Sequence, residues 1–179
     1  MARVLITGSA DGLGRLAAER LPDDVHAVVV HVRARERLTA VDDLVNRGAA
    51  VVVGDLADVE QTRAILDWSG RRSGSYADSK LFVATLAAAV ARLWPDVFSN
   101  AVDPGWVPTR MGGRGAPDDL RLGHLTQEWL ATSDEREALT SGGYWYHQRR
   151  TDPHPAVHDP RFQDQLLEAL GRFTAARIR

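Results

Sequence analysis

The 179-residue chain contains no cysteine, and only one of its 22 lysine and arginine residues, Lys80, is a lysine. Without cysteine there is no disulfide, no thiolate nucleophile and no cysteine-ligated zinc site. The formal net charge is only −2, and the basic residues are interleaved with acids, so the composition gives no reason to expect nucleic-acid or membrane binding. Because every other basic position is arginine, the ammonium at position 80 calls for a chemical reason.

Long apolar segments are also missing. No run approaches the ~18 residues of a membrane span, and the N-terminus passes directly into a β-branched segment and a glycine-rich turn rather than into a signal peptide. We therefore expect a cytoplasmic protein. The chain has no internal repeat and no linker long enough to divide it, so we expect one domain comprising residues 1–179.

Two kinds of apolar segment alternate along the chain. Short β-branched runs predict strands over residues 3–7, 25–32, 49–53, 98–102 and 144–147. Apolar residues at helical spacing predict helices over 12–21, 34–46, 59–66, 76–94 and 118–131, a short helix over 134–139, and a last helix starting at Pro160 behind the cap residue Asp159. This alternation predicts an α/β fold with a doubly wound, Rossmann-like parallel sheet of about five strands, covered by helices on both faces.

Glycines are concentrated where the first strand turns into the first helix, in Thr7-Gly8-Ser9-Ala10-Asp11-Gly12-Leu13-Gly14. Gly8 permits a tight turn, Gly12 lets backbone N–H groups approach a pyrophosphate, and Gly14 lets the helix pack closely on the strand. The helix N-terminus then faces the anion. An ordinary strand-to-helix turn is the alternative, but its place at the start of an alternating chain favours a nucleotide site. The residues of this site would be Gly8, Ser9, Asp11, Gly12, Leu13 and Gly14.

The end of the second predicted strand indicates which nucleotide is bound. An acid there would accept hydrogen bonds from a ribose 2′-hydroxyl, but the segment is His31-Val32-Arg33-Ala34-Arg35. The guanidinium of Arg33 suits a 2′-phosphate, which favours NADP(H) over NAD(H) as cofactor. The alternative is that Arg33 and Arg35 are solvent-exposed charges. After the third predicted strand, Asp55 and Leu56 could bracket an adenine ring, unless Asp55 only caps a turn.

Tyr76 and Lys80 lie four residues apart on the predicted helix 76–94, so their side chains share a face. A phenol and an ammonium on one face can carry out proton transfer, although an ordinary surface pair has the same spacing. A free phenol has a pKa of about 10, too high for easy proton exchange at neutral pH. The compact charge of Lys80 would favour the phenolate, a task for which the planar fork of arginine is less suited.

Together these motifs resemble those of the short-chain dehydrogenase/reductase family. The turn from Thr7 to Gly14 looks like its Thr-Gly-x-x-x-Gly-x-Gly motif. Tyr76 and Lys80 match its Tyr-x-x-x-Lys pair. The resemblance implies an oxidoreductase that interconverts a carbonyl and an alcohol of a small-molecule substrate. Tyr76 would exchange the proton, and Lys80 would also hydrogen-bond the nicotinamide ribose.

Two further segments extend the resemblance over most of residues 3–147. Asp55-Leu56 is similar to the adenine-side motif of the family. Pro104 and Gly105, with Thr109 after them, look like the loop that holds the nicotinamide amide. By this resemblance Asp55, Leu56, Pro104, Gly105 and Thr109 would all contact the cofactor.

The chain departs from the family pattern in its middle. The family has a serine thirteen positions before the tyrosine, where this chain has Arg63. The Asn-Ala-Gly turn of the family is also absent, so two central β-α units, roughly 40–60 residues or more, have no counterpart. Ser69, Ser73 or Ser75 could replace the missing hydroxyl.

Two arrangements would let such a shortened chain fold. One is a five-stranded sheet in the order 3-2-1-4-5, with strand 98–102 beside strand 3–7. The other is an intertwined dimer, in which a partner chain replaces the missing packing, and the excess of apolar residues on helix 76–94 favours a homo-oligomer. The protein would then be an NADP(H)-dependent oxidoreductase, or a degenerate nucleotide-binding or structural dimer that catalyses nothing and, at the extreme, binds no cofactor.

Two other groups of residues have less specific chemistry. His154, His158 and Asp159 are metal-ligand types, but the prolines around them predict a loop, so no metal site is expected. Trp106 and Met111 lie in the Pro/Gly-rich segment 103–117, where a substrate lid and simple packing account for them equally well.

Overall fold

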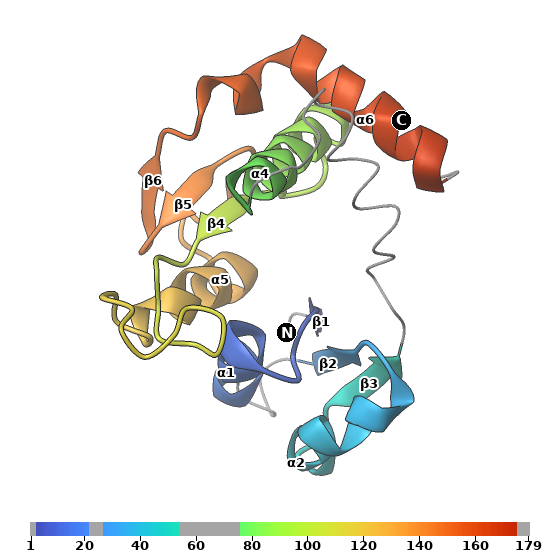
Figure 1. Cartoon of the computed structure of the whole chain (residues 1–179), viewed down its shortest axis with the longest axis vertical. Coiled ribbons are helices and arrows are strands. Elements are labelled where there is room, and N and C mark those ends of the chain that lie inside the picture. Colours follow the sequence, from blue (N-terminus) through green and yellow to red (C-terminus); the bar gives the residue numbers. More distant parts are fainter. Residues whose placement is uncertain (1–2, 22–26, 54–75, 175–179) are drawn as a thin grey trace. The chain divides into compact units, whose positions relative to one another are not determined.

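The computed structural model describes residues 3–21, 27–53 and 76–174. In chain order the elements are β1 (Arg3–Ile6), α1 (Gly12–Arg20), β2 (Ala27–Val32), the 3₁₀ helix η1 (Arg35–Val41), α2 (Asp42–Asn46), β3 (Ala50–Val53), α4 (Tyr76–Leu93), β4 (Ala101–Asp103), α5 (Leu122–Thr132), β5 (Tyr144–Tyr146), β6 (Arg149–Thr151), the 3₁₀ helix η2 (Pro155–His158) and α6 (Pro160–Thr174) (Figure 1). Helices alternate along the chain with the strands β1, β2 and β3 of a parallel sheet, which confirms the α/β, Rossmann-like class. No helix in these ranges is long and apolar enough to span a membrane.

The chain divides into two compact units. The first unit comprises Met1–Leu56 and Asp103–Ala138, and the second unit comprises Ala57–Val102 and Leu139–Arg179. The glycine turn, Arg33 and the segment with Pro104 and Thr109 belong to the first unit, whereas Tyr76 and Lys80 belong to the second.

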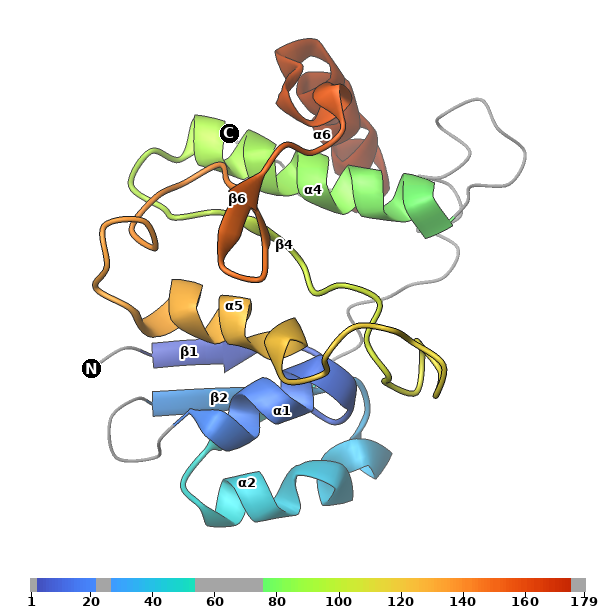
Figure 2. The ribbon, with the colours of Figure 1, turned by 90° about the vertical axis from the view of Figure 1, so that its left-hand side faces the viewer.

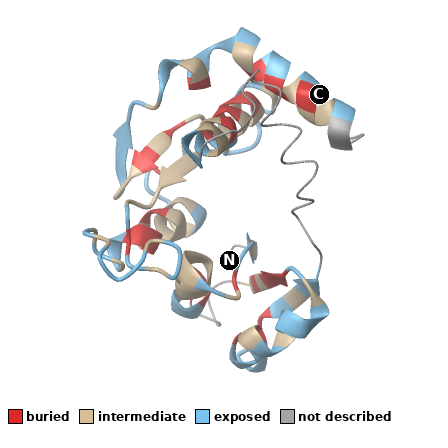
Figure 3. Cartoon of the chain, viewed as in Figure 1, coloured by how far each residue is buried: buried red, intermediate tan, exposed pale blue. Residues whose placement is uncertain are grey.

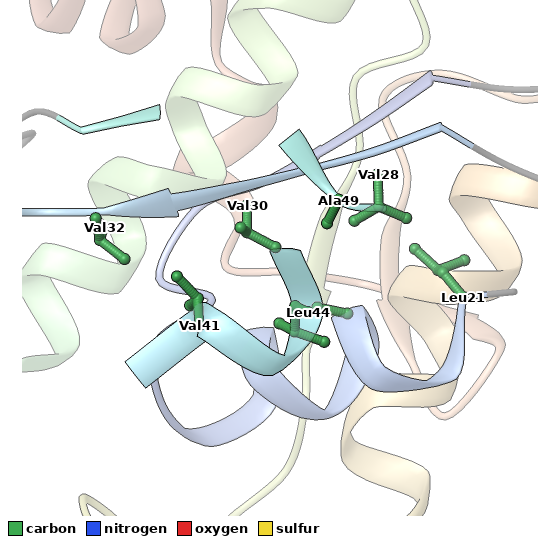
Figure 4. Close-up of a cluster of buried hydrophobic side chains, with 8 residues drawn as sticks. Leu21, Val28, Val30, Val32, Val41, Leu44 and Ala49 are labelled. Atoms are coloured by element: carbon green, nitrogen blue, oxygen red, sulfur yellow. The ribbon is translucent and has the colours of Figure 1, made fainter. Parts of the chain in front are cut away.

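The first unit is built on a parallel sheet in the order β1-β2-β3. Its core lies on one face and is made by alternate residues of β2, the end of α1 and the η1–α2 segment. The buried members are Ala18, Leu21, Val28, Val30, Val32, Val41, Leu44 and Ala49 (Figure 4). Val4 and Ile6 of β1 pack against the same core, so Leu5 points to the opposite face by strand alternation and is 59% exposed.

The second unit is organised around α4, along which buried and exposed residues alternate (Figure 3). α6 packs against α4 (Figure 2), with the ring centroids of Phe82 and Phe162 6.3 Å apart. Arg92 donates a hydrogen bond to Gln163 (2.7 Å) and forms an ion pair with Asp164. Some of the apolar residues of α4 are thus covered by α6 within the second unit.

The strands after α4 form a second sheet. β4, β5 and β6 are neighbours in that order, and β5 and β6 are antiparallel. The single sheet predicted in the order 3-2-1-4-5 is therefore wrong, because β1 and β4 belong to different sheets, although the neighbours 3-2-1 and 4-5 are paired as expected. The sequence gives no sign of β6, because His147 and Gln148 adopt positive φ (47° and 60°) in the hairpin turn without the Asn or Gly that usually marks one.

The predicted strand 98–102 starts only at Ala101. Just before the strand, the side chain of Asn100 makes hydrogen bonds to backbone groups, where a strand would pair through its own backbone. Its amide nitrogen donates to the carbonyl of Thr140 (2.7 Å), and its amide oxygen accepts from the N–H of Gly143 (2.8 Å). Side-chain bonds of this kind compete with regular secondary structure, so the strand is shorter than its apolar residues predict.

Other predicted bounds change for similar reasons. α5 begins at Leu122 rather than at 118, because the carboxylate of Asp119 accepts from the N–H of Arg121 (2.8 Å) and makes a turn there. The short helix predicted over 134–139 is wrong, since this stretch is a turn in which Ser133 Oγ accepts from the N–H of Glu135 (3.1 Å). The predicted helix 59–66 lies outside the described residues.

The start of α6 is as predicted. Pro160 is its first residue, and the carboxylate of Asp159 accepts a hydrogen bond from the N–H of Arg161 (2.9 Å). This side-chain cap satisfies one of the backbone N–H groups that a helix start leaves without a partner. The capping residue and the proline after it thus correctly predicted the start of this helix.

Candidate functional site

The turn between β1 and α1 has the backbone geometry that its glycines predict. Gly8 and Gly12 have φ of 68° and 56°, in the left-handed region that favours glycine. Gly14 is needed for space instead, because a Cβ there would lie 2.8 Å from the carbonyl oxygen of Gly8 and 3.0 Å from that of Thr7. Only glycine lets α1 begin so close to the end of β1.

The turn is fastened to the neighbouring strand by Ser9, whose side chain is fully buried. Its Oγ accepts from the N–H of His31 (2.7 Å) and donates to the carbonyl oxygen of the same residue (3.0 Å). Asp11 caps α1, since its carboxylate accepts from the N–H of Gly12 (2.8 Å). The hydroxyl of Ser9 therefore fixes the spacing between the glycine turn and the end of β2.

Arg33 directly follows β2 and is exposed. Arg15 on α1 is instead committed to the fold: it donates to Glu19 and to the carbonyl of Ala40, both at 2.7 Å, and pairs with Asp43. The hydrogen bond between them raises the pKa of Arg15 and lowers the pKa of Asp43 from their usual values. Arg33 thus has a guanidinium that an anion can reach, and Arg15 does not.

The segment after β4 reaches the glycine turn within the first unit. The methyl carbon of Thr109 lies 4.0 Å from the position that a Cβ on Gly12 would take. Thr109 is itself held in place, because its Oγ1 accepts from the N–H of Gly112 (3.2 Å) and its carbonyl accepts from the N–H of Gly113 (2.8 Å). Two motifs that are almost one hundred residues apart in the sequence therefore meet.

Asp118 closes the base of this segment. Its carboxylate accepts from the N–H of Trp106 (2.5 Å), and its own N–H donates to the Trp106 carbonyl (3.1 Å). Gly105, with φ of 80°, has no room for a side chain, because a Cβ would lie 2.7 Å from Asp118 Oδ2. Sequence reasoning missed Asp118, which looks like part of a helix start, and it also missed the packing role of Gly123 on α5.

Tyr76 and Lys80 lie at the start of α4 in the second unit. The Lys80 Nζ is 5.1 Å from the centroid of the Tyr76 ring, so the two side chains share a face as expected. Tyr76 is 67% exposed, and Lys80 is exposed as well. The hydroxyl of Ser79 donates to the Tyr76 carbonyl (2.6 Å).

Several residues named from the sequence lie outside the described residues. They are Asp55, Leu56, Arg63, Ser69, Ser73 and Ser75. Their predicted roles, in adenine binding and in replacement of the missing serine, stay predictions.

Of the remaining candidates, His154 and Trp106 make hydrogen bonds within the fold, and Met111 is exposed. Within the described ranges there is no cluster of three or more His, Cys, Asp or Glu residues that could hold a metal ion. His154 instead caps η2, with Nδ1 accepting from the N–H of Ala156 (3.2 Å). Trp106 and Met111 are 61% and 83% exposed, and the Trp106 indole donates to the carbonyl of Gly112 (2.9 Å).

Comparison with known proteins gives relatives along the whole chain, although no model of a protein family matches it. The chain is 25% identical to the short-chain dehydrogenase chry4 of Gibberella zeae and 26% identical to the short-chain dehydrogenase chyC of Penicillium rubens, and each match covers 99% of both chains. It is also 35% identical, over 58% of its length and 38% of the relative's, to a protein of Streptomyces sp. (strain C5) named as a daunorubicin C-13 ketoreductase, DnrU.

The lengths of these matches reveal an internal difference. The match with chry4 runs over 256 residues, 77 more than the 179 of this chain, and the match with chyC runs over 257. Because both partners are covered to 99%, the additional residues of the relatives interrupt the match rather than extend it. The chain is therefore shortened inside, as expected, and the location of the gap between β3 and α4 stays a prediction.

The glycine turn, the Tyr76–Lys80 pair and the segment after β4 follow one another along the chain in the order that the resemblance implies. The two relatives matched over 99% of the chain are named short-chain dehydrogenases. Motif order, fold and relatives agree, and the chain is similar to short-chain dehydrogenases over nearly its full length.

Proposed function

We propose that this protein is an NADP(H)-dependent oxidoreductase that interconverts a carbonyl group and an alcohol. The observation that carries the proposal is the approach of Thr109 to Gly12, at 4.0 Å from the position of its absent Cβ. The segment that would hold the nicotinamide and the turn that would hold the pyrophosphate are thereby adjacent in one unit. The ketoreductase name of one relative supports a carbonyl substrate.

The first unit fits a dinucleotide phosphate. A Cβ on Gly8 would meet nothing within 4 Å, so the space in front of the turn is open. The N-terminus of α1, a nine-residue helix, follows directly and attracts an anion through its N–H groups and dipole. Arg33 at the end of β2 would pair with the 2′-phosphate, which is the basis for proposing NADP(H) rather than NAD(H).

The second unit supplies the acid–base chemistry in this proposal. The bound cofactor would contribute the hydride. The Tyr76 hydroxyl would give a proton to a carbonyl oxygen or take one from an alcohol. Lys80, with its Nζ 5.1 Å from the ring, would stabilise the negative charge that remains on the phenol oxygen. The exposure of Tyr76 leaves its hydroxyl accessible to a substrate.

A second candidate is a nucleotide-binding protein that has lost turnover, and the internal shortening favours it. The matches with the two short-chain dehydrogenases run over 256 and 257 residues against 179 in this chain, and Arg63 stands where, by the resemblance, the family has its serine. Such a protein would retain the first unit's site without a complete catalytic one. In both cases we propose a homo-oligomer, because Val83 on α4 is 60% exposed and a partner chain would cover it.

The test compares the wild type with Tyr76→Phe and with a matched control, Tyr146→Phe, which removes a hydroxyl elsewhere in the second unit. Oxidation of NADPH is followed with a panel of aldehydes and ketones, and NADPH binding is measured separately. Tyr76→Phe is expected to lower kcat about 100-fold or more and to leave NADPH binding unchanged, with no effect in the control. Unchanged turnover would reject the role of Tyr76, and NADPH binding without turnover in the wild type would select the second candidate.

A further inference from the structure

Gly123, the second residue of α5, lies where three parts of the first unit converge. A Cβ at this position would lie 2.9 Å from Val107 Cγ1, 3.1 Å from Leu13 Cδ2 and 3.3 Å from the carbonyl oxygen of Pro104. Leu13 belongs to α1 directly behind the glycine turn, and Pro104 and Val107 belong to the segment that carries Thr109. Because Gly123 has no side chain, Val107, Leu13 and Pro104 can all lie close to its backbone.

The backbone does not explain the glycine. Gly123 is in a helix and is not among the glycines with positive φ. In a helix, glycine is less favourable than alanine by about 1 kcal/mol. Helix formation alone would favour alanine here, so the close approach of neighbouring atoms is the physical reason for the glycine.

A displacement at Gly123 would reach the glycine turn. Val107 is buried, and Thr109, two residues further on, is bonded to it through the N–H of Thr109 and the carbonyl of Val107 (2.7 Å). The base of the segment is tied by Asp118 to Trp106, so a push on Val107 is not absorbed there. It would change the spacing between Thr109 and Gly12.

We propose that Gly123 is a positioning residue for the nicotinamide half of the cofactor. It seats the segment of Pro104 and Val107 against α1, so that Thr109 stands at the required distance from the glycine turn. This inference rests on the proposed function, since it assumes that NADP(H) binds to the first unit. The adenosine half does not depend on Gly123 in this scheme, because it would be bound by the glycine turn and Arg33.

The test uses two ligands that differ only in the nicotinamide, NADPH and 2′-phospho-ADP-ribose. Gly123→Ala is expected to weaken NADPH binding about tenfold, which is about 1.4 kcal/mol, and to leave the binding of 2′-phospho-ADP-ribose unchanged. The matched control is Gly115→Ala in the same segment, where a Cβ meets nothing within 4 Å and φ is not positive. Equal loss for both ligands, or no loss for NADPH, overturns the proposal.

A second variant separates positioning from folding. Val107→Ala removes the closest atom that the new methyl group would meet, so the double variant Gly123→Ala/Val107→Ala is expected to recover NADPH affinity relative to Gly123→Ala. The double variant is judged against Val107→Ala alone. Failure to recover affinity contradicts the steric argument.

A third measurement needs no nucleotide. Trypsin cleaves after Arg110 and Arg114, which are exposed in the same segment. Gly123→Ala is expected to speed cleavage at these two bonds because its methyl group displaces the segment, whereas unchanged cleavage overturns the inference. If the wild type binds neither NADPH nor 2′-phospho-ADP-ribose, the proposed function fails, and the cleavage rates still decide whether Gly123 positions the segment.

Discussion

The glycine turn of the first unit and the Tyr76 helix of the second differ in how firmly the rest of the chain holds them. Ser9 is completely buried and makes two hydrogen bonds to the backbone of His31, and Gly14 fits against the backbone of Gly8 with no room for a methyl group. Tyr76, in contrast, is 67% exposed, and Lys80, its side-chain neighbour on the same face, is exposed as well.

The difference indicates which of the two motifs depends less on the segment by which this chain is shorter than its relatives. Among the described residues, the contacts given above for the glycine turn are made within the first unit, so the turn keeps its geometry. The family's missing serine belongs to the segment that, by the resemblance, would flank Tyr76. Nucleotide binding should therefore be robust in this chain, and turnover should be sensitive.

The largest effect is expected when the Tyr76–Lys80 pair is broken with its charge retained. Lys80→Arg should lower kcat about 100-fold, because a planar guanidinium cannot take the place of a compact ammonium next to the phenol. The reciprocal change Arg150→Lys, on the exposed strand β6, is the control and should leave turnover unchanged. Steady-state kinetics with NADPH and the best carbonyl of the panel measure both, and wild-type kcat in Lys80→Arg would mean that the pair is not catalytic.

Next in size is damage to the glycine turn. Gly14→Ala places a methyl group 2.8 Å from the Gly8 carbonyl oxygen, which should lower the free energy of unfolding by about 2 kcal/mol and weaken NADPH binding. Urea denaturation and nucleotide titration report the two effects. A variant with wild-type stability would show that the close packing of α1 on β1 is not required, and Gly115→Ala, at an open position, supplies the baseline.

A smaller change is expected in cofactor choice. Arg33→Ala should reduce the preference for NADPH over NADH about tenfold by loss of a charge-assisted hydrogen bond, while NADH affinity stays the same. Arg35→Ala, two residues further along, is the matched control. The Kd values of NADPH and NADH are measured for both variants. An equal loss of NADPH preference in Arg33→Ala and Arg35→Ala would point to a general charge effect instead of a 2′-phosphate contact.

The smallest effect concerns the surface pair that holds α1 to α2. The hydrogen bond from Arg15 lowers the pKa of Asp43 in the folded protein, so the ionised carboxylate stabilises the fold above the unfolded pKa of about 4. That contribution is lost as the pH falls through the lower folded value. Asp43→Asn should therefore be slightly less stable than the wild type at pH 7, and the difference should shrink as the pH falls below the unfolded pKa of the carboxyl group. Thermal unfolding over a series of pH values measures this, and a difference that does not change with pH contradicts the ionic explanation.

Local motifs could be predicted from the sequence because their causes are local. Positive φ at Gly8 and Gly12, the tight packing of Gly14 and the shared face of Tyr76 and Lys80 all follow from residue type and spacing. The pairing of β1, β2 and β3 could be predicted as well, since short crossovers leave few topologies. The internal shortening was also visible as motifs that the chain lacks.

What could not be predicted depends on contacts between distant residues. Nothing in the sequence near Asp118 indicates that it bonds the backbone of Trp106, and nothing near Gly123 indicates that Leu13 and Val107 approach it. The separation of β1 and β4 into different sheets was missed for another reason. The prediction assumed that strands on either side of the lost units would close up against each other.

The most direct test of the account is a calorimetric titration of the purified full chain with NADPH and, separately, with NADH. The central claim is that the first unit retains a site for a 2′-phosphorylated dinucleotide. It predicts one saturable site per chain with NADPH bound about tenfold or more tightly than NADH. Saturable binding of neither nucleotide, with the chain shown to be folded, would contradict it.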